Sequence, residues 1–217
     1  VGEPDLGPSA LHSLTRLRAD RAIAAVEIGR LYDSLETETR SGLLLAACSK
    51  VLGSGATGPS ESFVAGELQG LHLRSVSRVL RILGLAHDPD RIDKIAESLS
   101  SSDAAARSNA LELLEGTLDG RSAMTVMPFM DLVSEGMPLR RVIDQLPERD
   151  RVQSAPAEVL AEHPDWWPRA LALHYLGRDA EVGHPDPEFA QHYEDDEMIP
   201  LVEKVMILRS EEHTSEL

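Results

Sequence analysis

The amino-acid sequence predicts an all-α fold, and three observations lead to this prediction. Aromatic residues make up only 4% of the 217 residues, whereas Leu and Ala are abundant, a balance that favours helices over sheets. Apolar residues recur with helical periodicity along most of the chain, and no segment shows the strict alternation of a half-buried strand. Acid-proline pairs at Asp88-Pro89 and Asp186-Pro187 are typical helix starts.

The first part of the chain is predicted to hold three helices after a short amphipathic segment. Apolar spacing indicates helices over 19–39, over 41–52 and over 61–86. The run GSGATGPS, residues 53–60, separates the last two, and its Gly, Ser and Pro content predicts a flexible loop. We expect a soft structural boundary at this loop.

Shorter helices are predicted for the rest of the chain. The helix after Asp88-Pro89 has one apolar face, formed by Ile92, Ile95, Ala96 and Leu99. Ser102 and Asp103 are expected to start the next helix. Others are expected over 123–133, 139–146, 156–162, 165–176 and 197–208, with a turn at 183–187. Amphipathic helices of this size are marginal alone, so about nine or ten of them must pair and stack as a solenoid or an irregular bundle.

One spacing of five residues occurs twice, 62 residues apart: an Asp, an Arg one turn later, an Ala-Leu pair and a final Leu. The Asp is expected to cap its helix, and the Arg to reach an acid or a carbonyl of the neighbouring repeat. The small Ala allows a close helix approach, and the Leu residues fill the shared core. This recurrence predicts a HEAT-like α-solenoid of stacked helix pairs. The repeat positions are Asp103, Arg107, Ala110, Leu111 and Leu114, then Asp165, Arg169, Ala172, Leu173 and Leu176.

The same residues carry a family resemblance. The segment SSSDAAARSNALELLEGTLDGR, residues 100–121, resembles the signature helix of the HEAT domain in bacterial proteins related to the ATP/ADP translocases. Three further segments are similar to that domain: residues 21–35, 75–92 and 198–209. In the family, the helix that corresponds to residues 21–35 contains a Glu and a pair of aromatic residues. This sequence departs from that pattern, because Tyr32 is the only aromatic residue of the pair and Leu31 precedes it. The resemblance covers most of residues 18–208.

The resemblance implies a position within a larger protein. In that family, a multi-spanning, major-facilitator-like domain precedes the HEAT repeats, and a cyclic-nucleotide-binding domain follows them. This sequence contains neither of those domains, so transport and nucleotide binding are expected to lie outside it. The domain organisation is therefore expected to be N-terminal solenoid helices over 1–52, the loop 53–60 and HEAT-like repeats over 61–208.

Both ends of the sequence suggest a fragment. The first residue is Val1 rather than an initiator Met. Residues 209–217, RSEEHTSEL, resemble the translation of a sequencing-adapter oligonucleotide, of the kind found at the ends of metagenomic gene models. We expect this segment to be artefactual and exclude it from the fold prediction.

Charge and cysteine content limit the function classes. The formal charge of −16, from 37 acids and 21 bases, repels phosphate backbones, so no nucleic-acid partner is expected. A single cysteine, Cys48, precludes an internal disulfide and suits a reducing, cytoplasmic compartment. It lies in the apolar run 43–52, which favours a buried hydrophobe over a nucleophile. No apolar run is long enough to insert into a membrane.

Four other features are candidate sites. Trp166 and Trp167 are adjacent in a predicted first helical turn, so one is expected in the core and the other at a partner surface. Met124, Met127, Met130 and Met137 suit either core filling or an adaptable docking surface. His184, His192 and the acidic run 194–197 could bind a metal, although a solvated acidic loop is the better interpretation. His163 and His174 do not have zinc-ligand spacing.

No catalytic, cofactor-binding or metal-binding residue is predicted. The Gly-Ser runs within 53–60 lack the preceding strand that a nucleophile elbow or a phosphate loop requires. The preferred hypothesis is a non-enzymatic scaffold that links the two flanking domains and contacts them or another protein. The alternative is a free-standing HEAT adaptor that binds a protein partner. A HEAT-type lyase or DNA glycosylase is a third hypothesis, and the acidic charge opposes the glycosylase.

Overall fold

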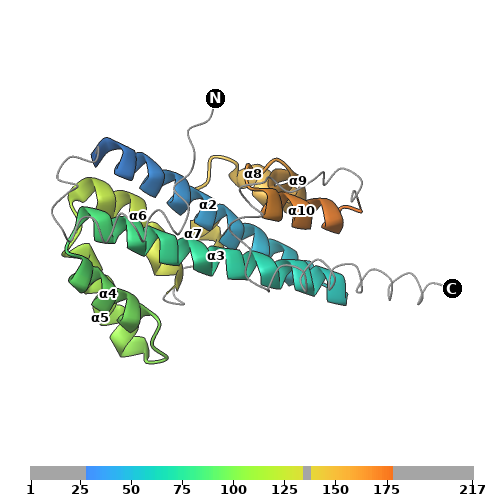
Figure 1. Cartoon of the computed structure of the whole chain (residues 1–217). Coiled ribbons are helices and arrows are strands. Elements are labelled where there is room, and N and C mark those ends of the chain that lie inside the picture. The colour runs from blue at the N-terminus through green and yellow to red at the C-terminus, as the bar shows by residue number, and fades with distance from the viewer. Residues whose placement is uncertain (1–27, 134–137, 178–217) are drawn as a thin grey trace, which may run out of the picture. The chain divides into compact units, whose positions relative to one another are not determined.

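The computed structural model describes residues 28–133 and 138–177, and every regular element in these ranges is an α-helix (Figure 1). The all-α prediction is therefore confirmed for this part of the chain. The predicted turn at 183–187, the predicted helix at 197–208, and the His184, His192 and 194–197 cluster lie outside the described residues. The helices are α2 (Ile28–Gly55), α3 (Pro59–Ala86), α4 (Pro89–Leu99), α5 (Ala104–Glu115), α6 (Gly120–Val133), α7 (Leu139–Ile143), α8 (Arg149–Ser154), α9 (Pro156–Ala161) and α10 (Trp166–Tyr175).

The chain divides into two compact units. Among the described residues, the first unit holds 28–44, 71–133 and 138–147, and the second unit holds 45–70 and 148–177. The long helices α2 and α3 therefore each supply residues to both units. This division differs from the predicted boundary at 53–60. In the described ranges no helix combines the length and the hydropathy needed to cross a lipid bilayer.

Helix α2 runs without a break where two helices were predicted. The expected interruption near residue 40 is wrong, because Ser41 and Gly42 both continue the helix. Gly42 is buried and has no side chain where α2 meets its neighbours. A Cβ there would lie 2.5 Å from Cε2 of Phe129 and 2.9 Å from Cβ of Ser75. The glycine therefore serves close packing rather than helix termination.

The predicted loop at 53–60 is also shorter than expected, since only residues 56–58 are not helical. Gly53 and Gly55 complete the last turn of α2, and Pro59 is the first residue of α3. The Glu61 carboxylate accepts hydrogen bonds from the main-chain N–H groups of Thr57 and Gly58. These bonds hold the connection tightly and lower the pKa of Glu61.

The predicted starts of α4 and α5 are confirmed. Asp88 is the N-cap of α4, its carboxylate accepts from the N–H of Asp90 at 3.1 Å, and Pro89 follows. The apolar face predicted for this helix is buried at Ile92, Ile95 and Leu99. Helix α8 was not predicted, because its six residues, RDRVQS, contain a single apolar side chain.

The core of the first unit is fixed around a buried histidine. His72 is 3% exposed, and its Nδ1 lies 3.1 Å from the carbonyl oxygen of Gly42. Its ring meets that of Phe129 edge to face, with 5.3 Å between the centroids. These contacts join α2, α3 and α6. The side chains buried most completely in this unit include Val79, Leu83, Leu114, Val126, Phe129, Met130 and Val142.

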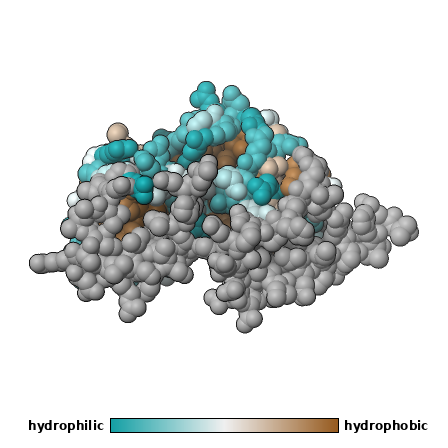
Figure 2. All heavy atoms as spheres, turned by 45° about the horizontal axis from the view of Figure 1, so that its top comes forward, coloured by the Kyte–Doolittle hydropathy of each residue, from teal (hydrophilic) through white to brown (hydrophobic). Residues whose placement is uncertain are grey.

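The second unit has its own apolar core. Leu68, Leu160 and Leu171 are fully buried there, and the Ser49 hydroxyl donates to the carbonyl of Ala65 at 2.7 Å. On the face drawn in Figure 2, hydrophilic residues form most of the outer surface of the described part, and hydrophobic residues show mainly in recesses. The visible part of this face thus has the polarity of an ordinary protein surface.

Candidate functional site

The predicted repeat positions fall at matching places in two helix hairpins. Helix α4 packs against α5 in the first unit, and α9 packs against α10 in the second (Figure 1). In each hairpin the second helix carries the Asp–Arg–Ala–Leu pattern. The connections are Ser100–Asp103 and Glu162–Asp165, so each has four residues. We call these the first hairpin (α4–α5) and the second hairpin (α9–α10).

The two connections begin and end with similar backbone angles. The residue after the first helix has φ −80° and ψ −6° at Ser100, and φ −94° and ψ 1° at Glu162. The capping Asp has φ −77° and ψ 118° at position 103, and φ −71° and ψ 136° at position 165. The first and the last residue of the four-residue turn therefore have nearly the same backbone conformation in both hairpins.

The hydrogen bonds within the connections also correspond. The N–H of Ser101 donates to the carbonyl three residues earlier at 3.2 Å, and that of His163 does the same at 3.0 Å. The side chains of these two residues then accept from the N–H of the following Asp. Ser101 Oγ lies 3.1 Å from the Asp103 nitrogen, and His163 Nδ1 lies 3.0 Å from the Asp165 nitrogen. A serine and a histidine thus perform one structural role.

The repeated arginine closes each hairpin. Arg107 Nη1 donates to the carbonyl oxygen of Ser101 at 2.8 Å. Arg169 Nη1 lies 3.4 Å from the carbonyl oxygen of His163 and 3.5 Å from that of Pro164. A carbonyl acceptor was predicted for this arginine, although in a neighbouring repeat rather than in its own hairpin. The acceptor lies in the connection just before the arginine's own helix.

The repeated aspartate differs between the hairpins. Asp103 caps α5 with its side chain, which accepts from the N–H of Ala105 at 3.0 Å. Asp165 occupies the N-cap of α10 but makes no side-chain capping bond. The Asp165 carboxylate instead lies 4.0 Å from Nδ1 of His163. The predicted cap is therefore confirmed only for the first hairpin.

The small and large apolar positions are buried to different degrees. Ala110 and Ala172 are both almost fully buried, as expected for a close helix approach. Leu114 and Leu173 are buried, whereas Leu111 and Leu176 are partly exposed. In both hairpins the pattern thus marks a buried alanine and one buried leucine of the two.

Both tryptophans belong to the core of the second unit. Trp166 is 9% exposed and Trp167 is 5% exposed. Their rings stack with 5.6 Å between the centroids and 24° between the planes. The prediction that one of them faces a partner is therefore wrong. Adjacent side chains in the first turn of a helix diverge at Cβ, but large rings can turn back to the same side.

His163 is an ionisable group that is both buried and hydrogen-bonded within the second hairpin. It is 4% exposed, and because Nδ1 accepts a main-chain hydrogen bond, the neutral ring must carry its proton on Nε2. Burial lowers the pKa of His163, the Asp165 carboxylate raises it, and the Arg169 guanidinium lowers it. Burial is the largest of these effects, because Asp165 is half exposed and solvent screens its charge.

A second polar cluster, in the first unit, was not predicted. The Tyr32 hydroxyl of α2 donates to Oδ2 of Asp119 at 2.6 Å. Asp119 Oδ1 accepts from the N–H groups of Arg121 and Ser122, each at 3.0 Å, at the start of α6. These hydrogen bonds lower the pKa of Asp119 to about 2, and the bond from Tyr32 has the largest effect. The two partners are 87 residues apart, so no local signal could have joined them.

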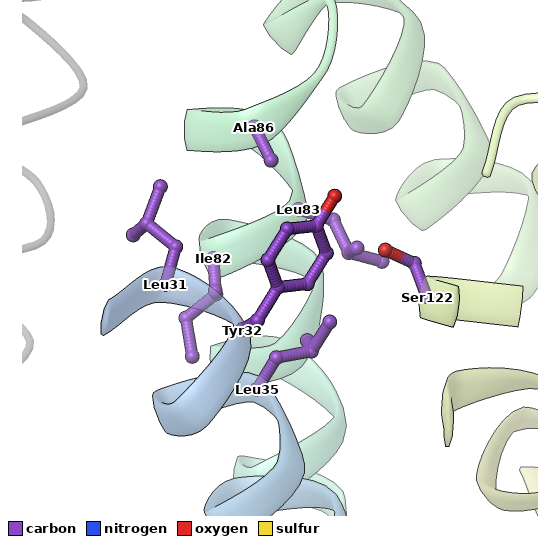
Figure 3. A pocket seen from close by; sticks show the side chains of 7 residues that line it. All are labelled: Leu31, Tyr32, Leu35, Ile82, Leu83, Ala86 and Ser122. Carbon is purple, nitrogen blue, oxygen red and sulfur yellow. The ribbon is translucent and has the colours of Figure 1, made fainter. Parts of the chain in front are cut away.

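This cluster borders a small hollow between α2, α3 and α6. Figure 3 shows the Tyr32 ring between α3 side chains and Ser122, and the Arg121 guanidinium lies 5.1 Å from the ring centroid. The space for water-sized spheres is about 10 Å³, room for roughly one water molecule. Pockets for small-molecule ligands are far larger. The hollow therefore suits a structural role at a helix junction.

The remaining sequence candidates have ordinary surroundings. Cys48 is fully buried and burial raises its pKa to about 12, so the prediction of a buried hydrophobe is confirmed. Ser60 Oγ lies 3.1 Å from Nε2 of His174, and this contact joins α3 to α10. Met130 is buried and Met124 is 77% exposed, so the methionines do not share one role. Met137 lies outside the described residues. Within 28–133 and 138–177, no group of three or more His, Cys, Asp or Glu side chains converges as metal ligands would.

Comparisons with known proteins give no assignment. Neither a protein-family model, nor a curated protein, nor a solved structure matches the chain.

Proposed function

We propose that this chain is a non-enzymatic helical-repeat scaffold, built from HEAT-like helix pairs. The observation that carries the proposal is the recurrence of one hairpin connection in both units. The two connections share their length, the backbone angles of their first and last residues, the bond to the Asp N–H and the bond from the Arg. Three of the four connection residues differ between them, so the common geometry supports a repeated structural unit.

The scaffold would work as a stiff spacer in the cytoplasm. Several of its helices pack against the next helix in the chain, such as α4 with α5 and α9 with α10, whereas the long helices α2 and α3 also contact helices much later in the chain. Repeat arrays of this kind transmit position and strain over a distance without a ligand pocket of their own. By the family resemblance, the segments joined would be a transporter-like membrane domain and a cyclic-nucleotide-binding domain. The partners of this chain would then be protein domains of the same polypeptide.

The gene on both sides of this segment provides the decisive test. Long-read sequencing from the source DNA is expected to show one reading frame that codes for several apolar spans upstream and a nucleotide-binding barrel downstream. A complete gene that codes for neither would overturn the linker proposal and favour the free-standing adaptor.

A binding experiment tests whether this chain itself binds a cyclic nucleotide. Cyclic AMP or cyclic GMP, added to the purified 217-residue chain at millimolar concentration, should leave the Tm unchanged. A ligand that binds only the folded state raises the Tm by mass action. A clear rise would therefore contradict a pure spacer.

A further inference from the structure

The second hairpin differs from the first in one chemically important respect. The residue that accepts from the Asp N–H is Ser101 in the first hairpin and His163 in the second. A hydroxyl oxygen remains an acceptor at every accessible pH. An imidazole nitrogen is an acceptor only while the ring is neutral, since both nitrogens of the imidazolium are donors.

We propose that the second hairpin is a pH-sensitive element, in which protonation of His163 frees the Asp165 N–H and loosens the start of α10. Protonated Nδ1 would place an N–H against the main-chain N–H that it now meets at 3.0 Å. The hairpin must open for the ring to accept the proton, because the side chain is almost fully buried. The first hairpin, with Ser101, does not respond.

The charged groups around the ring set the direction of the effect. Asp165, with Oδ2 4.0 Å from Nδ1, favours the imidazolium, and Arg169 opposes it. The neighbouring Glu162 carboxylate is engaged by Arg151 of α8, with 2.6 Å between Oε1 and Nη2. Burial outweighs Asp165, so the folded hairpin holds a neutral ring.

The direction in which pH changes the stability of the hairpin follows from the linkage between folding and proton binding. The pKa of His163 is lower in the folded state than its ordinary value of 6.5, so the opened hairpin binds the proton more readily. The stabilisation is fully present above pH 6.5 and is lost as the pH falls below it. Most carboxylates titrate at a pH of about 4. The opening of the hairpin therefore begins at a higher pH than their titration.

The chain contains a natural probe for this transition. Trp166 and Trp167 are its only tryptophans, they form the first turn of α10, and both are buried beside the connection. Opening at His163 should expose them to water. Their emission should shift to longer wavelength as the pH falls from about 7 to about 5 in the wild-type chain.

The test compares this titration in three variants of the full chain. In His163→Asn, the amide oxygen takes the place of Nδ1 as acceptor and does not titrate, so the emission should stay constant over this range. His163→Ser copies the first hairpin and should also be insensitive, which guards against a folding defect of the Asn variant. His174→Asn, which replaces a histidine of α10 itself, is the matched control and should retain the wild-type shift.

The thermal transition gives a second readout. Between about pH 7 and about pH 5 the wild-type Tm should fall by about 2–4 °C more than that of His163→Asn, the size expected for the loss of one hydrogen bond in a chain of this size. The proposal is overturned if the wild-type emission does not change, if His163→Asn and His163→Ser titrate like the wild type, or if His174→Asn alone abolishes the response.

Discussion

Arg107 donates a hydrogen bond from Nη1 to the main-chain oxygen of Ser101, 2.8 Å away and six residues earlier in the chain. Arg169 stands in the same relation to His163, at 3.4 Å. In both hairpins the acceptor lies just past the C-terminus of the preceding helix, where the helix dipole presents partial negative charge. The guanidinium therefore joins the end of one helix to the second turn of the next.

Removing that guanidinium should destabilise the first hairpin. Arg107→Met keeps the apolar stem and loses the bond, and the free energy of unfolding should fall by about 1 kcal/mol, since the group is partly exposed. Arg91→Met, at an exposed position of α4, is the matched control and should change stability by about 0.5 kcal/mol or less. Urea unfolding followed by circular dichroism measures both. Equal effects would show that the Arg107 bond is not structurally important.

Two helical glycines should respond in opposite directions to alanine. At Gly42 the new Cβ would meet Phe129 at 2.5 Å, so Gly42→Ala should destabilise by about 1–3 kcal/mol despite the better helix propensity. At Gly66 nothing lies within 4 Å, so Gly66→Ala should stabilise by about 0.5–1 kcal/mol. Differential scanning calorimetry gives both shifts. A stabilised Gly42→Ala variant would contradict the packing of α2 against α6.

Asp119 should contribute acid-dependent stability. Its folded pKa of about 2 lies below the ordinary value of 3.8, so the unfolded chain takes up the proton first. The contribution is present above pH 3.8 and is lost as the pH falls towards 2. The stability gap between the wild type and Asp119→Asn should thus narrow from about pH 5 to about pH 2.5. Asp33→Asn, which removes an exposed carboxylate of α2, is the control.

Cys48 should be inert in the folded chain. The thiol is fully buried with a pKa raised to about 12, and the thiolate is the reactive form. Ellman's reagent at neutral pH should label it only after unfolding in urea. Rapid labelling of the native chain would mean that this part of α2 opens readily.

Local signals predicted the helix starts well, and they failed where a contact is distant. Asp88 and Asp103 were identified as caps because a cap involves neighbours in sequence. The continuity of α2 was missed, since the reason for Gly42 is Phe129, which lies 87 positions further along. The burial of both Trp166 and Trp167 depends on how their rings stack, which helical periodicity does not express.

The sequence predicted which residues recur in the candidate site, but it did not predict the hydrogen bonds that they make. The repeated Asp, Arg and Ala positions do mark equivalent places in two hairpins. The correspondence of Ser101 with His163 could not be read from the sequence, because the two side chains share only the ability to accept a hydrogen bond.

Exchange of the connections tests the repeated hairpin most directly. In the graft Ser100→Glu, Ser101→His and Ser102→Pro, the first hairpin receives the second connection, since Asp103 is common to both. A scrambled control, Ser100→Pro, Ser101→Glu and Ser102→His, has the same composition without the acceptor in its place. Urea unfolding should show the graft within about 1 kcal/mol of the wild type and the scrambled control lower by about 2 kcal/mol or more. Equal losses in the two variants would contradict the claim that one hairpin geometry is used twice.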